Sequence, residues 1–83
     1  MNPSLHHPLI TELPEHRDSI HTLKTADAHF RRLFDEYHDV DKQVVRIEEQ
    51  IEPASDAHTE SLKIRRLHLK DELLRIIRRH EGA

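Results

Sequence analysis

The chain contains no cysteine and a single glycine, Gly82. Without cysteine it has no disulfide and no thiolate metal site, so its stability must come from packing, association or a non-thiolate ligand. Loops that cradle phosphate groups need several glycines, and the chain does not have them. The composition therefore excludes the common nucleotide-binding fingerprints and is compatible with a reducing compartment.

Long apolar runs are also missing. No stretch approaches the roughly 20 consecutive apolar residues that are needed to cross a bilayer. Residues 1–15 lack the charged start and the continuous apolar run of a secretory signal. We therefore expect a cytoplasmic protein with no membrane association.

Aromatic residues are scarce, and the composition suits helices better than sheets. The aromatic side chains are Phe30, Phe34 and Tyr37, and all four prolines lie outside the two long periodic segments. A sheet would show alternating β-branched and aromatic residues with glycine-bearing turns. With 35% hydrophobic and 35% charged residues in 83 positions, the sequence predicts one small all-α domain.

Residues 1–24 form a leader with short helical segments. Pro8 can occupy the first position of a brief helix, and Pro14 can start another that runs to about Leu23. Thr25 offers an N-cap for the segment that follows, and Asp27 suits the first turn of that segment. The apolar phase continues across Thr25, but we expect the chain to bend there.

Two long segments, at about residues 26–51 and 56–80, show the spacing of amphipathic helices. Their apolar residues recur in alternating steps of four and three, which is a heptad seam. Pro53 ends the first helix because the residue before a proline disfavours α geometry, and Ser55 then caps the second helix. The first seam is Ala26, Phe30, Leu33, Tyr37, Val40, Val44, Ile47 and Ile51, and the second is Thr59, Leu62, Arg66, Leu69, Leu73 and Ile76.

A tight connection between these helices makes them antiparallel neighbours, so residues 25–83 are predicted to form a two-helix coiled-coil hairpin. In one register every layer matches an a position with a d position. Arg66 falls opposite Val40 in this register. Its stem either lies along Val40 with the charge near Asp41 or Glu36, or it sets the register or binds a partner. The apolar layers pair Val44 with Leu62, Tyr37 with Leu69, Leu33 with Leu73 and Phe30 with Ile76.

The second helix carries more apolar surface than its seam needs. Leu67, Leu74 and Ile77 lie to one side of the seam, and Phe34 of the first helix faces the same flank. Burying each such side chain is worth roughly 1.5–3 kcal/mol. Either the leader folds back over this flank, or a second copy or another protein docks on it to form a helical bundle. We expect self-association through these four residues, with a dimer favoured.

Charge is distributed unevenly along the chain. Residues 1–60 carry 6 Lys or Arg against 13 Asp or Glu, whereas residues 61–83 carry 7 against 3. The two helices therefore complement each other across the hairpin, for example through Asp41 and Glu48 near Lys63. The alternative is a basic surface for RNA or DNA, made by Arg65, Arg75, Arg78 and Arg79.

The nine histidines lack the spacing of a metal site. No His-x-x-x-His pair is present, and the acid-x-x-His step from Asp35 to His38 has no Glu-x-x-His counterpart, the motif of di-iron bundles, anywhere in the chain. No serine or threonine has the motif of a nucleophile, and an elongated hairpin offers no obvious pocket for paired carboxylates. We expect no metal, no cofactor and no enzyme activity, although the histidines allow a pH- or metal-responsive assembly.

A set of short motifs spans about residues 16–77. They are Leu23-Lys24-Thr25-Ala26-Asp27-Ala28-His29-Phe30, Leu33-Phe34-Asp35-Glu36-Tyr37-His38, Asp41, Arg46-Ile47-Glu48, Leu62-Lys63, Arg65-Arg66-Leu67 and Leu69-Lys70-Asp71-Glu72-Leu73. In these motifs the sequence resembles the YdcH-like family of small bacterial proteins, whose function is unknown. The resemblance implies a bacterial cytoplasmic α-hairpin, and it supplies neither an activity nor ligand residues. The chain departs from the family in its histidine content, at His6, His7, His58, His68 and His80.

Overall fold

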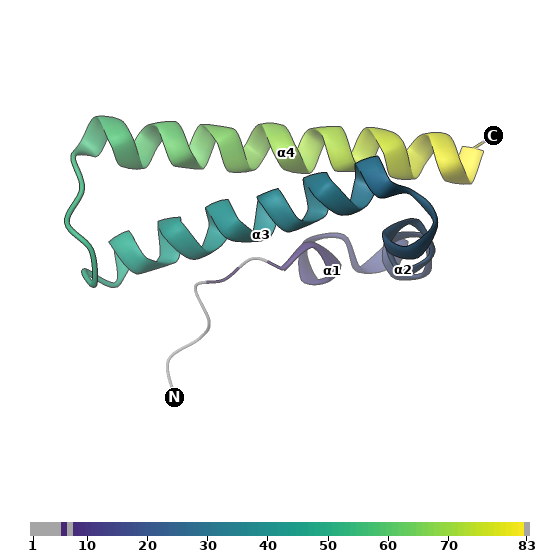
Figure 1. The fold of residues 1–83 in the computed structure, drawn as a ribbon, viewed down its shortest axis with the longest axis horizontal. Coiled ribbons are helices and arrows are strands. Elements are labelled where there is room, and N and C mark those ends of the chain that lie inside the picture. Colours follow the sequence, from purple (N-terminus) through teal and green to yellow (C-terminus); the bar gives the residue numbers. More distant parts are fainter. Residues whose placement is uncertain (1–5, 7, 83) are drawn as a thin grey trace.

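The computed structural model describes residue 6 and residues 8–82, and every regular element in this part of the chain is a helix. Residues 1–5 and 7 of the predicted leader lie outside the described residues. A single helical turn, α1 (Leu9–Glu12), leads through a 3₁₀ turn (Pro14–His16) into α2 (Arg17–Ala26). The two long helices are α3 (Ala28–Glu48) and α4 (Asp56–Gly82) (Figure 1). The all-α prediction is confirmed.

The long helices lie side by side and run in opposite directions (Figure 1). Arg66 of α4 donates a hydrogen bond to Asp41 of α3 over 2.8 Å, one residue beyond the Val40 position assigned by the sequence register. Arg65 and Lys63 of α4 pair with Glu36 and Glu48 of α3 over 2.6 and 3.9 Å. The Cα radius of gyration is 13.9 Å, above the roughly 12 Å of a compact chain of this length. The molecule is therefore elongated, as expected.

The corner between α3 and α4 differs from the predicted one. α3 ends at Glu48, three residues before the predicted Ile51, because Gln50 takes a left-handed conformation with φ of 60°. The amide of Gln50 then donates to the Ile47 carbonyl, and the amide of Ile51 donates to the Arg46 carbonyl. These two bonds form a Schellman motif, which ends a helix without proline. Ile51 was placed in the apolar seam, but it is 62% exposed in this corner.

Side-chain caps fix where the long helices begin. The amide of His58 donates to the Ser55 hydroxyl over 3.1 Å, so the predicted Ser55 cap is confirmed. The predicted Thr25 cap is wrong. α2 continues through Thr25 to Ala26, and the cap of α3 is Asp27, whose carboxylate accepts the amide of Phe30 over 3.0 Å. Asp27 is the single extended residue between the two helices, with φ of −128° and ψ of 107°.

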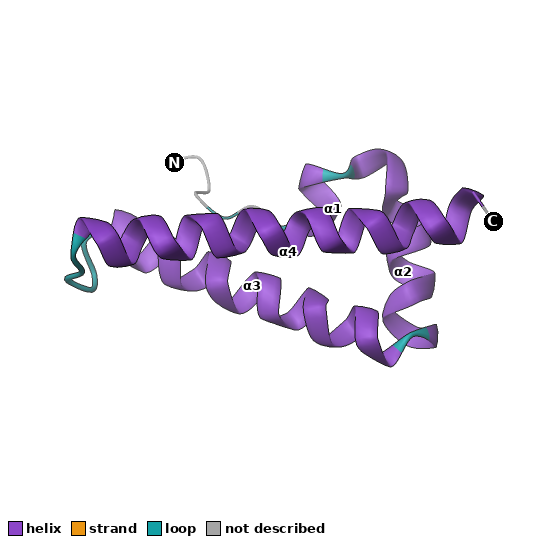
Figure 2. Cartoon of the chain, turned by 90° about the horizontal axis from the view of Figure 1, so that it is seen from above, coloured by secondary structure: helices purple, strands orange, loops and turns teal. Residues whose placement is uncertain are grey.

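The leader folds back onto the long helices and supplies part of the core. Leu9, Leu13, Ile20 and Leu23 are all buried. They belong to one cluster with buried residues of α3 and α4 such as Phe30, Leu73 and Ile77. Figure 2 shows α2 crossing the end of the helix pair at a steep angle, where α3 and α4 diverge. The leader thus covers the flank that the sequence left open, which is the first of the two predicted alternatives.

Candidate interaction surface

The outer face of α4 carries the most exposed apolar side chains of the two long helices. Ile64 is 48% exposed and Leu67 is 54% exposed, although the opposite face of α4 lies in the core. Leu74 follows Leu67 by seven residues and is half-buried, packed in part against the core. Steps of three and seven residues keep side chains on one side of a helix. We call Ile64, Leu67 and Leu74 the outer seam.

The four residues predicted to mediate association differ in how exposed they are in the structure. Leu67 is exposed, and Phe34 and Leu74 are half-buried. Ile77 is fully buried within the chain, so its predicted place on an open surface is wrong. The leader is the reason, because its apolar side chains fill the flank on which a second copy was expected to dock.

The ring of Phe34 packs against side chains of its own chain. Its ring centroid lies 4.4 Å from that of His38, and the Lys24 ammonium of α2 sits 4.6 Å above the ring. A cation at this distance from an aromatic face is attracted by the ring quadrupole. Phe34 therefore belongs to the junction of α2 and α3. Ile64 was not among the residues predicted for this surface, but it is exposed there in place of Phe34. Its position three residues before Leu67 was the feature of the sequence that could have identified it.

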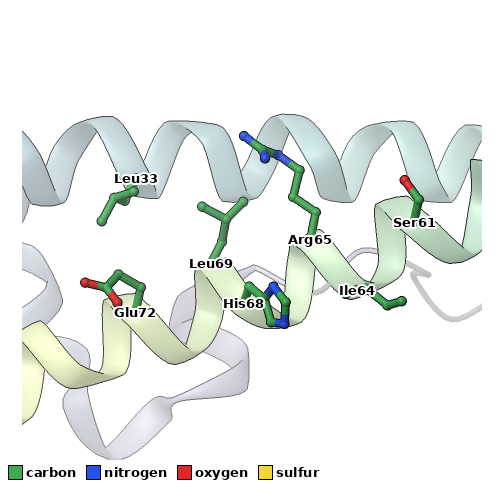
Figure 3. Close-up of a pocket in the computed structure, with 7 residues that line it drawn as sticks. All are labelled: Leu33, Ser61, Ile64, Arg65, His68, Leu69 and Glu72. Carbon is green, nitrogen blue, oxygen red and sulfur yellow. The ribbon is translucent and has the colours of Figure 1, made fainter.

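Two of the hollows that border the outer seam are lined by Leu74 and by Ile64. One has a volume of about 380 Å³ and is lined by Asp71, Leu74, Arg75 and Arg78. The other, of about 510 Å³, lies between α3 and α4 (Figure 3). There Arg65 and Leu69 reach from α4 towards α3, whereas Ile64 points away from it. The second hollow is lined by Leu33, Ser61, Ile64, Arg65, His68, Leu69 and Glu72.

The arginines proposed as a basic surface do not act as one group. Arg65 pairs with Glu36 over 2.6 Å, and Arg75 pairs with Glu72 over 3.4 Å. Arg78 and Arg79 are exposed near the C-terminal end of α4. Two of the four predicted cations are thus partly neutralised by acids of the same chain, and such exposed pairs are worth about 0–1 kcal/mol.

A polar network fastens the leader to the long helices. The amide of Leu9 donates to Nε2 of His38 over 3.2 Å, and Nδ1 of the same ring lies 2.8 Å from the Phe34 carbonyl. A ring that accepts at Nε2 and donates at Nδ1 is neutral. Lys70 of α4 reaches Glu12 of α1 over 3.3 Å. The imidazole of His38 therefore links the leader to α3.

A second set of contacts joins α2 to the end of α4. The Ser19 hydroxyl donates to the Glu81 carboxylate over 2.5 Å, and Nδ1 of His16 lies 2.9 Å from the same oxygen. The hydrogen bond from Ser19, followed by that from His16, lowers the pKa of the Glu81 carboxyl below its usual value. These contacts hold α2 across the open end of the helix pair.

Asp41 of α3 is a buried acidic residue that contacts both α4 and the leader. It is 2% exposed and accepts from Arg66, while His6 of the leader lies 3.3 Å from its other oxygen. Tyr37 lies beside this pair and is 1% exposed. Burial, together with the charges of Glu12 and Asp41, raises the pKa of the Tyr37 hydroxyl to about 12. Sequence spacing offered Asp41 or Glu36 as the neighbour of the Arg66 charge, and the structure has Asp41. Spacing did not predict the burial of that carboxylate.

The described residues hold no group of three or more histidine, aspartate or glutamate side chains placed to bind a metal ion. Asp35 of the acid-x-x-His step pairs with Arg31 over 3.3 Å, and His38 bonds to backbone groups as described above.

Within residues 6 and 8–82, no helix combines the length and apolar character that crossing a bilayer requires.

Comparison with known proteins gives a family but no activity. A family model described as "Protein of unknown function (DUF465)" matches residues 30–77. The chain is 36% identical over 64 residues to the "Uncharacterized protein YdcH" of Escherichia coli (strain K12), covering 77% of this chain and 86% of the relative. The protein of the same name from Shigella flexneri matches with the same identity and coverage. No solved structure matches the chain.

Proposed function

Because the chain belongs to the DUF465 family of proteins of unknown function, we propose that it is a non-enzymatic helical interaction module that associates with a second copy of itself. In this proposal α3 and α4 pack as a coiled-coil hairpin. Two copies then meet along α4 and form a bundle of four long helices in the cytoplasm.

The proposal is carried by the outer seam. Ile64 and Leu67 expose about half of their surface on a helix that already uses its other face for the core. Removing apolar surface from water is worth about 25 cal/mol for each Å². Neighbouring apolar residues in a row along a helix suit a helical partner better than they suit water.

A second copy fits this row when the two α4 helices lie antiparallel. Ile64 of one copy then faces Leu74 of the other, and Leu67 lies beside Asp71 of the other. Ile64 meets the hollow formed by Asp71, Leu74, Arg75 and Arg78, so an apolar side chain has a depression to enter. A two-fold axis repeats this contact, as in most homodimers.

Replacing Leu67 with glutamate tests the proposal. The wild-type mass should follow a monomer–dimer equilibrium in sedimentation equilibrium, and Leu67→Glu should weaken the dimer by roughly tenfold or more because it places a charge in the seam. The control is Ile51→Glu, which changes a residue that is 62% exposed in the corner, away from α4. It should leave the dimer unchanged. A strictly monomeric wild type, or equal masses for both variants, would contradict the proposal.

Nucleic-acid binding through the C-terminal end of α4 is the alternative. Arg78 and Arg79 are exposed next to each other there, which favours contact with phosphates. The chain has no tryptophan and one tyrosine, so copurifying RNA would dominate its ultraviolet absorbance. A clean protein spectrum at low salt, with no shift of labelled RNA on a native gel, removes this alternative.

A further inference from the structure

The leader is attached to the rest of the molecule through one residue. α2 ends at Ala26 and α3 begins at Ala28, so Asp27 makes the whole change of direction. The Asp27 carboxylate caps α3 at the Phe30 amide, and this hydrogen bond is lost if the backbone of Asp27 becomes helical. The bend therefore depends on the Asp27 cap. Without this cap, the residues around position 27 would be an ordinary helix-forming sequence.

The sequence on both sides of Asp27 suits one continuous helix. No glycine or proline occurs from Arg17 to Glu48, and two alanines flank Asp27. The buried Ile20 and Leu23 of α2 keep the apolar phase that Phe30 continues in α3. In a continuous helix the amides of residues 28–30 would bond to the carbonyls of residues 24–26. Straightening would thus exchange one cap for regular helical hydrogen bonds.

The contacts of the leader do not depend on which chain supplies it. Its buried side chains are Leu9, Leu13, Ile20 and Leu23. Its polar contacts join Leu9 to His38 over 3.2 Å and Glu12 to Lys70 over 3.3 Å. A leader that arrived from a second copy would make the same contacts with α3 and α4. Only the bend at Asp27 distinguishes the two arrangements, and short connections of this kind favour exchange of an element between protomers.

We propose that two copies of this chain exchange leaders. In the exchanged dimer, residues 17–48 form a single helix, and the leader of each copy packs on the flank of the other copy that includes Phe30, Leu73 and Ile77. In this exchange the leader of the second copy occupies the leader-binding flank. This inference does not rest on the outer seam of the proposed function, which lies on a different face of α4.

Two substitutions at the bend move the equilibrium in opposite directions. Asp27→Ala removes the cap and favours the continuous helix, so it should tighten the dimer by roughly ten- to thirtyfold, counting both copies. Ala28→Pro should prevent exchange. Ala28 is an exposed first helical residue, where proline is well tolerated, and the extended Asp27 suits a residue before proline. Within a continuous helix the same proline would break the backbone ladder.

Cross-linking of Glu12 to Lys70 shows which chain supplies the leader. A carbodiimide joins a carboxylate and an amine that touch, and these two groups lie 3.3 Å apart. Unlabelled and isotope-labelled chains are unfolded together, refolded and cross-linked, and the linked peptides are read by mass spectrometry. Exchange predicts mixed-isotope peptides in the dimer fraction, more of them in Asp27→Ala, and none in Ala28→Pro. Thermal melts confirm that both variants fold.

The outcomes separate this inference from the proposed function. Interchain links in a dimer that responds to the bend but not to Leu67→Glu support exchange and contradict the outer-seam contact. A dimer that is lost in Leu67→Glu and contains only intrachain links contradicts exchange and supports the outer seam. A wild type and an Asp27→Ala variant that both remain monomeric as concentration rises contradict exchange.

Discussion

Tyr37 links the burial of one side chain to the pH dependence of the whole molecule. It is 1% exposed, and the pKa of its hydroxyl is raised from 10.0 to about 12, mainly by burial. Glu12 and Asp41 contribute to this rise, because a phenolate near two carboxylates is unfavourable, whereas Arg66 acts in the opposite sense. The neutral phenol is therefore part of the folded state.

We predict that alkaline pH destabilises the fold through Tyr37. Between pH 10 and 12 the unfolded chain releases the phenolic proton and the folded chain keeps it, so the free energy of unfolding falls as pH rises. One pKa unit is worth about 1.4 kcal/mol, so the loss across this interval is roughly 2–3 kcal/mol. The measurement is urea unfolding at several pH values. In Tyr37→Phe this part of the pH dependence should disappear, and an unchanged slope in that variant would contradict the assignment.

Single residues also show what spacing does not reveal. Arg66 interrupts the apolar seam, and the helical register places its charge near Asp41 or Glu36, of which the structure has Asp41. Asp41 is 2% exposed and lies 3.3 Å from His6 of the leader, which comes from a distant part of the sequence. A buried ion pair is weak support for stability but helps to fix one arrangement of the helices. Local periodicity contains no such long-range information.

At the scale of elements, the ends of helices were harder to predict than the helices themselves. The Ser55 cap followed from a hydroxyl placed before a periodic segment, and it is present. The end of α3 did not follow from Pro53, because the helix stops at Glu48 through the left-handed Gln50. Glutamine is not a typical residue for that conformation, so residue type alone does not predict this helix end.

We predict that Gln50→Gly stabilises the protein. A non-glycine residue in the left-handed region costs energy through its Cβ, and glycine removes that cost. The gain should be about 0.5–1 kcal/mol in the free energy of unfolding, measured with chemical denaturant. Gln43 is an exposed residue inside α3, so Gln43→Gly should instead cost about 1 kcal/mol. Equal effects of the two substitutions would show that Gln50 carries no backbone strain.

For the whole molecule, the decisive question was what covers the open flank of the helix pair. The sequence showed that Ile77 and its neighbours needed cover but favoured a second copy over the leader. In the structure the leader provides that cover, and Ile77 is fully buried. Spacing alone could not decide between the two covers, because amphipathic spacing in α2 and α4 identifies two apolar faces without saying which faces meet.

The leader should therefore control the overall dimensions of the chain. The Cα radius of gyration is 13.9 Å with the leader in place. Ile20 is fully buried in the middle of α2, so Ile20→Asp places a charge in the core and should release the leader. We predict a rise in the radius of gyration of roughly 2 Å or more, well short of the roughly 28 Å of an unfolded chain.

Small-angle X-ray scattering at concentrations where the chain is monomeric measures this change, and circular dichroism follows the helices that remain. His21 is the neighbouring exposed residue of α2, so His21→Asp introduces the same side chain without touching the core. That variant should keep the wild-type dimensions. If Ile20→Asp and His21→Asp scatter alike, the apolar face of α2 does not hold the leader, and the open flank of α3 and α4 must be covered in another way.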